Sequence, residues 1–82
     1  MIQVRVRFLS YLSSLVGTEQ VELCLPEATR LADLSRCLQE MYPAQAPLLA
    51  RITYLVDQKA AAPETVLADG AQVLALMSLG GG

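Results

Sequence analysis

The chain has 82 residues, of which 54% are hydrophobic and 17% are charged, and its formal net charge is −2. This length is enough for one small domain, and the hydrophobic content supports a folded core rather than a disordered chain. Six Lys and Arg residues scattered along the chain do not form the basic face that nucleic-acid binding needs. No apolar run approaches the ~18 residues of a membrane span, and no signal peptide is visible. We therefore expect a cytoplasmic protein that binds neither nucleic acid nor membrane.

The first two expected elements are a strand and a short helix. In residues 2–9, IQVRVRFL, one face carries Ile2, Val4, Val6 and Phe8, and the other carries Gln3, Arg5, Arg7 and Leu9. This alternation predicts a half-buried strand. The next segment, SYLSSLVG, predicts a short helix with Ser10 as N-cap and Gly17 just after its end.

A second strand and the longest helix follow. Residues 19–26, EQVELCLP, predict a strand with Val21, Leu23 and Leu25 facing inward and with Glu22 and Cys24 facing outward. Residues 29–43, TRLADLSRCLQEMYP, predict an amphipathic helix with Thr29 as N-cap and an end near Tyr42. Its apolar stripe consists of Leu31, Leu34, Leu38 and Met41. We expect this helix to cover one face of the sheet.

The second half of the chain is expected to complete the sheet. Residues 44–50, AQAPLLA, are a loop or a short turn of helix, and residues 51–57, RITYLVD, are a third strand. A short edge strand is possible around Ala60 and Ala61. The last strand, residues 71–77, carries Val73, Ala75 and Met77 on one face and Leu74 and Leu76 on the other. A strand that is apolar on both faces is usually central in its sheet, so the order of elements predicts an α+β fold.

The usual catalytic groups are missing from the sequence. There is no histidine to act as a general base or to activate Cys24 or Cys37, and the carboxylates are spread over separate elements. No Cys/His set matches a zinc site, and no glycine-rich phosphate-binding motif is present. The two cysteines are interpreted as reduced thiols, with a Cys24–Cys37 disulfide as the alternative. We therefore do not expect an enzyme that acts on its own.

The sequence ends with Gly80, Gly81 and Gly82. Glycine buries no side chain and loses the most backbone freedom on ordering, so such a run adds little to a fold. We expect residues 1–79 to form the domain and residues 80–82 to form a flexible tail. The tail is either a linker remnant or a working end, because glycine lets a backbone enter a narrow active site.

Three segments together resemble a known family: VRVRFLSYLSSLVGTEQVEL, TRLADLSRCLQEMYP and TVLADGAQVLALMSLGGG. The chain resembles the ubiquitin-like β-grasp sulfur carriers of the ThiS/MoaD superfamily, closest to the small subunit of molybdopterin synthase, the MoaD family. This resemblance covers nearly the whole chain. It implies a mixed sheet of four to five strands that is covered on one face by one main helix.

The resemblance also implies a function for the tail. The terminal Gly-Gly of the family falls on Gly81 and Gly82. An E1-like adenylyltransferase would use ATP to adenylate Gly82, which would then become a thiocarboxylate. The tail would enter the large subunit of molybdopterin synthase and donate sulfur to a pterin precursor in molybdenum cofactor biosynthesis. In that family two small subunits lie at opposite ends of a large-subunit dimer, and the carrier itself holds no cofactor or metal.

A docking surface is expected next to the tail. If the main helix covers the face that carries Val4 and Phe8, then Leu9, Leu74 and Leu76 form an apolar patch that Arg5 and Arg7 border. Leu79 and Gly80 would extend this partner-binding surface toward Gly82. The alternative is that the APLLA segment folds over the patch as a satellite core.

Four functional interpretations remain open at this point. The first is the molybdopterin pathway, and the second is the same chemistry in another pathway, such as that of thiamine, cysteine or another thio-metabolite. The third is a ubiquitin-like protein modifier. The fourth is a plain β-grasp interaction module in which the glycines are incidental.

Overall fold

The structure is a computed structural model, and it describes residues 1–77. Leu79, Gly80, Gly81 and Gly82 lie outside the described residues. The expected boundary between a domain of residues 1–79 and a tail of residues 80–82 lies outside them as well.

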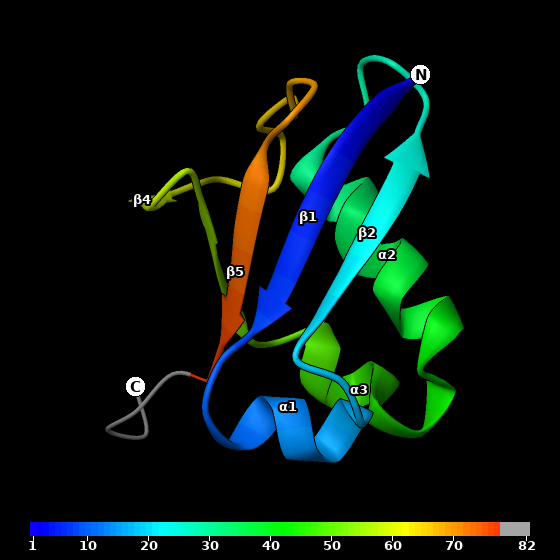
Figure 1. The fold of residues 1–82 in the computed structure, drawn as a ribbon, viewed down its shortest axis with the longest axis vertical. Helices are drawn as coiled ribbons and strands as arrows, with labels where there is room; N and C mark the ends of the chain where they lie inside the picture. Colours follow the sequence, from blue (N-terminus) through cyan, green and yellow to red (C-terminus); the bar gives the residue numbers. More distant parts are fainter. Residues whose placement is uncertain (78–82) are drawn as a thin grey trace.

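Five strands form one sheet: β1 (Ile2–Phe8), β2 (Gln20–Leu25), β3 (Thr53–Val56), β4 (Lys59–Ala60) and β5 (Gln72–Leu76). Their order across the sheet is β2-β1-β5-β3-β4 (Figure 1). The β1 and β5 strands are parallel, and all other neighbours are antiparallel. The mixed sheet and the central place of β5 are confirmed.

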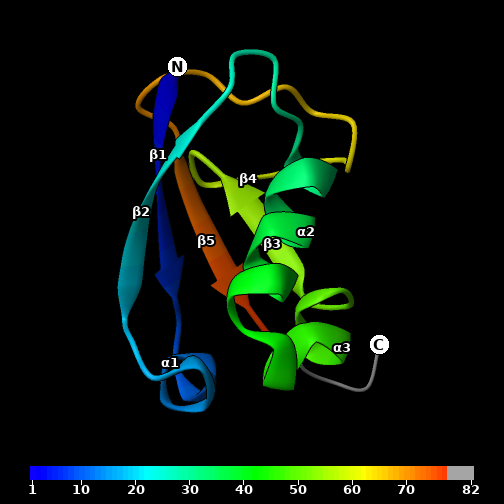
Figure 2. The same cartoon turned by 90° about the vertical axis from the view of Figure 1, so that its right-hand side faces the viewer.

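The helices are α1 (Tyr11–Val16), α2 (Leu31–Met41), the 3-10 turn η1 (Pro43–Gln45) and α3 (Ala46–Leu49). Figure 2 shows α2 and α3 on the same side of the sheet, with α1 below one end of β1. The α+β class and the covering of one sheet face by one main helix are therefore confirmed.

The core lies between the sheet and α2. Alternate residues of β1 are buried, and they pack with Leu31, Leu34 and Leu38 from α2. The expected stripe is wrong at Met41, which is 41% exposed. Met41 is the last residue of the helix, and the next residue takes its place: Tyr42 packs against the core with its ring edge-on to Phe8, at a centroid distance of 5.9 Å.

The expected N-cap of α2, Thr29, is wrong. At α2 the N-cap is Arg30, and its backbone N–H donates to Asp33 Oδ2 at 3.0 Å, whereas Thr29 Oγ1 donates to the Pro26 carbonyl. The first helical N–H groups of α2 donate to the carbonyls of Pro63 and Thr65, so a distant loop supplies the acceptors.

Ser10 is the N-cap residue of α1, as expected, but its φ is 53° and its side chain makes no cap hydrogen bond. Its carbonyl accepts instead from the Ser13 hydroxyl at 2.8 Å. The predicted end of α1 is confirmed, because Gly17 is left-handed and its N–H donates to the Ser13 carbonyl.

The short edge strand exists, but it comprises Lys59 and Ala60 rather than Ala60 and Ala61. Asp57 and Gln58 connect it to β3, and both have positive φ, 49° and 70°. Positive φ at both positions is the hallmark of a two-residue type I′ hairpin turn, whose twist matches that of the flanking strands. The turn therefore fixes Val56 opposite Lys59.

Candidate functional site

One face of the sheet is left without a helix among residues 1–77 (Figure 2). The side chains on this open face follow from the strand alternation. They are Gln3, Arg5 and Arg7 on β1, Gln20, Glu22 and Cys24 on β2, Thr53 and Leu55 on β3, and Gln72, Leu74 and Leu76 on β5. The polar side chains gather on β1 and β2, whereas the large apolar ones gather on β3 and β5.

Four leucines form an apolar patch on or next to this face. We call Leu9, Leu55, Leu74 and Leu76 the leucine patch; all four are half-buried, and none packs against the core. Leu55 lies opposite Leu74 in the antiparallel pairing of β3 and β5. The Leu9 N–H donates to the Ala75 carbonyl at 3.0 Å and so extends the β1–β5 ladder toward Leu76. The structure thus brings together the three predicted leucines Leu9, Leu74 and Leu76.

The alternative in which the APLLA segment covers the patch is wrong. This segment forms most of α3, which packs against α2 on the helix side of the sheet. Leu49 is fully buried there, and Leu48 packs against the same core. The leucine patch therefore stays uncovered by residues 1–77.

Sequence reasoning missed Leu55. The signal for it was the alternation in TYLV: Tyr54 and Val56 join the core, so Leu55 lies on the opposite face with Thr53. The pairing of Leu55 with Leu74 could not be predicted, because it depends on the register between two strands that are far apart in the chain.

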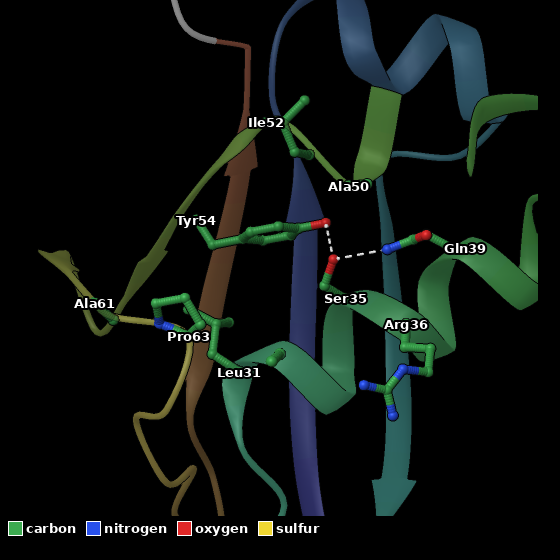
Figure 3. Close-up of a pocket in the computed structure, with 10 residues that line it drawn as sticks. Leu31, Ser35, Arg36, Gln39, Ala50, Ile52, Tyr54, Ala61 and Pro63 are labelled. Atoms are coloured by element: carbon green, nitrogen blue, oxygen red, sulfur yellow. Dashed lines mark hydrogen bonds between the residues drawn. The ribbon is translucent and has the colours of Figure 1, made fainter. Parts of the chain in front are cut away.

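A second concave site lies on the helix side. It is a pocket of about 380 Å³ between α2 and β3. Figure 3 shows Tyr54, Ser35 and Gln39 converging in it, with Arg36 at its edge. The Tyr54 hydroxyl donates to the Leu49 carbonyl at 2.8 Å, and Gln39 Nε2 donates to Ser35 Oγ at 3.2 Å. These polar groups satisfy one another, so we interpret them as a tie between α2, α3 and β3 rather than as a catalytic set.

We expect Tyr54→Phe to lower the free energy of unfolding by about 1 kcal/mol at neutral pH. The reason is that the Leu49 carbonyl loses the hydrogen bond that the Tyr54 hydroxyl donates. Burial raises the pKa of Tyr54, and the Ser35 hydrogen bond opposes this. The Tyr54 hydroxyl is protonated in both the folded and the unfolded protein below about pH 10, and above that pH it loses its proton first in the unfolded protein. Wild-type stability should therefore fall as the pH rises above about 10.

Urea unfolding of the wild type and Tyr54→Phe at neutral and alkaline pH checks this. The variant should lose less stability than the wild type on going to alkaline pH. Equal losses in the two proteins would show that Tyr54 does not titrate differently in the folded state.

No cluster of metal-binding side chains forms among residues 1–77. No three His, Cys, Asp or Glu side chains of these residues are placed to hold a metal ion. Cys24 is exposed and Cys37 is half-buried, and both are free thiols, so the alternative of a disulfide is wrong. Within the same residues, no helix is long and apolar enough to cross a membrane.

Comparison with solved structures gives close matches over nearly the whole chain. A chain assigned as molybdopterin converting factor subunit 1 from Pyrococcus furiosus matches with a TM-score of 0.87 and 20% identity, over 96% of this chain and all of that one. Small archaeal modifier protein 1 from H. volcanii matches with a TM-score of 0.85 and 16% identity, over the same shares. The chain has the ubiquitin-like β-grasp fold. No protein-family model matches its sequence, and no curated protein matches it significantly.

A third neighbour of this β-grasp chain comes from a complex. It belongs to the complex of subunits 1 and 2 of molybdopterin-converting factor from Helicobacter pylori, with a TM-score of 0.70 and 20% identity over 99% of this chain and all of that one. The neighbours therefore agree with the expected resemblance in fold, and they include both a converting-factor subunit and a protein modifier.

Proposed function

We propose that this chain is a sulfur carrier whose Gly82 carboxyl group is adenylated and then converted to a thiocarboxylate. The observation that carries the proposal is the uncovered leucine patch on β5, the strand that leads into Gly80, Gly81 and Gly82. A partner that binds this patch holds the strand from which the tail extends. The terminal carboxyl group can then reach an active site of the partner that lies only a few residues' length from the docking surface. The domain supplies docking, and the partner supplies the catalytic groups that the chain lacks.

The chemistry requires an activating partner that uses ATP. A carboxylate is a poor electrophile, and adenylation solves this: a carboxylate oxygen of Gly82 bonds to the α-phosphorus of ATP, and pyrophosphate leaves. A sulfur nucleophile can then displace AMP at the carbonyl carbon. Glycines suit the approach to such a site, because they have no Cβ to collide with its walls. The partner for this step is an E1-like adenylyltransferase.

We further propose that the carrier acts as the small subunit of a molybdopterin synthase, the sulfur-donating part of a complex with a large subunit. The Helicobacter pylori neighbour, which is in complex with subunit 2, supports a partner of this kind. A heterotetramer with two carriers is then the expected assembly.

A second candidate is a ubiquitin-like protein modifier. The match to small archaeal modifier protein 1 favours it, with a TM-score of 0.85. The two functions share the adenylation of Gly82 and differ in the nucleophile that follows, sulfur in one case and a lysine amine in the other. Conjugates of higher mass in an extract of the host would identify the modifier.

The test of the proposal is the intact mass of the chain purified from its own host. Replacement of the terminal OH by SH adds the mass difference between sulfur and oxygen, and alkylation identifies the thioacid. Oxidation of Met1, Met41 or Met77 adds nearly the same mass but is not alkylated in this way. The recombinant chain is then incubated with ATP and the E1-like enzyme of the same host. The absence of an adenylate at Gly82 would contradict the proposal.

A further inference from the structure

A hollow on the open face lies beside the leucine patch. Its volume is about 320 Å³, and it is lined by Arg7, Asp57, Gln58, Gln72 and Leu74. Leu74 also belongs to the leucine patch, so the hollow and the patch form one continuous surface. Arg7 is next to Leu74 in the parallel register of β1 and β5, and the turn between β3 and β4 supplies Asp57 and Gln58. The hollow is thus formed by three segments that are distant in the sequence.

The two arginines of β1 differ in their contacts, although both are exposed on the same face. The guanidinium of Arg5 lies 3.1 Å from Glu22 Oε1 on the neighbouring strand, so its charge is paired. Within residues 1–77, no carboxylate lies within 4.0 Å of the Arg7 guanidinium. The acid of the hollow is Asp57, and its Oδ1 accepts from the Gln72 N–H at 3.0 Å. Among residues 1–77, Arg7 is therefore the arginine on this face that makes no ion pair and can offer its donors to a partner.

We propose that the hollow binds an Asp or Glu side chain of the protein that activates the tail, and that Arg7 pairs with this carboxylate. This inference rests on the proposed carrier function. A guanidinium presents a planar set of donors that matches a carboxylate, and the amides of Gln58 and Gln72 line the same hollow. The partner surface then has an apolar centre that covers the leucine patch and an acid beside it.

Contact with the leucine patch also strengthens this ion pair. When the partner covers Leu74, water is excluded from one side of the hollow, and a charge pair gains strength as the surroundings become less polar. Arg5 lies opposite Gln72 rather than Leu74, and its Nη2 is already paired with Glu22 Oε1 on the edge strand β2. Arg7 and Arg5 look equivalent in the sequence, but the structure therefore gives them different expected roles in binding the partner.

The test compares Arg7→Gln with Arg5→Gln, which each remove one positive charge from the same face of β1. The Kd for the E1-like enzyme of the host is measured by titration, and pyrophosphate release reports adenylation. We expect Arg7→Gln to weaken binding at least about 10-fold, because the partner's acid is left unpaired. Arg5→Gln should change it less than about threefold, since an exposed pair contributes little. Arg7→Lys should recover only part of the lost affinity, because an ammonium keeps the charge but lacks the planar donor set, and thermal unfolding of each variant checks the fold.

The salt dependence gives a second readout. Association of the wild type and of Arg5→Gln should slow as the ionic strength rises, and that of Arg7→Gln should respond less. Equal affinities of Arg7→Gln and Arg5→Gln, with normal adenylation of the wild type, would overturn this inference and leave the carrier function standing. No adenylation of the wild type by an active enzyme would overturn the carrier function and this inference with it.

Discussion

Deletion of Gly81 and Gly82 is expected to abolish adenylation of the chain by its E1-like partner. The shortened chain ends about 7 Å earlier, at roughly 3.5 Å per extended residue. Its carboxylate then stops short of the α-phosphate of ATP, and a misplacement of only about 1 Å can cost 100-fold in rate. The fold should be unaffected, because the core is built from residues between Ile2 and Ala75. ATP–pyrophosphate exchange measures the loss.

Binding of the shortened chain provides the internal control. The leucine patch is intact in this variant, so its Kd for the E1-like enzyme should stay within about threefold of the wild-type value, as expected when hot-spot residues are kept. Adenylation of the shortened chain at the wild-type rate would show that Gly82 is not the activated group. If the wild type itself is not adenylated, the plain interaction module becomes the better interpretation.

The β5 strand shows how much the sequence could predict. Val73 and Ala75 on one face of the strand are apolar, and so are Leu74 and Leu76 on the other face. This pattern predicted a central strand, and the structure places β5 between β1 and β3. A central strand of a sheet with one covered face must leave one of these pairs uncovered. The apolar residues on both faces of the strand therefore predicted both the central place of β5 and most of the leucine patch.

The errors arise where the decisive contact is distant in the sequence. The Thr29–Arg30 region resembled an ordinary N-cap, but the carbonyls of Pro63 and Thr65 accept from the first turn of α2. Likewise, the Arg5–Glu22 pair depends on the register of β1 and β2, and this leaves Arg7 without an ion pair within residues 1–77. Local patterns predict elements and faces, whereas contacts between elements decide which cap or charge remains free.

Leu76→Arg is expected to weaken binding to the E1-like enzyme by at least about 30-fold, the size of a central apolar contact in an interface. The substitution removes an apolar side chain next to the root of the tail and places a guanidinium where the partner's apolar surface would lie. Leu76 is half-buried and does not pack against the core, so the free energy of unfolding should change by less than about 1 kcal/mol. Titration for the Kd and urea unfolding for stability measure the two effects separately.

Gln3→Arg is the matched control for Leu76→Arg. Gln3 is exposed on the same face, on the neighbouring strand β1, and it lies beyond Arg5 at the end of the strand away from Leu9. The substitution adds the same charge without touching the leucine patch, so its Kd should stay within about threefold, as expected outside a hot spot. Leu55→Arg, on a different strand but opposite Leu74, should weaken binding as Leu76→Arg does. If all three variants bind equally well, the open face is not the docking surface; if only the two leucine variants lose binding, the patch spans β3 and β5 as one site.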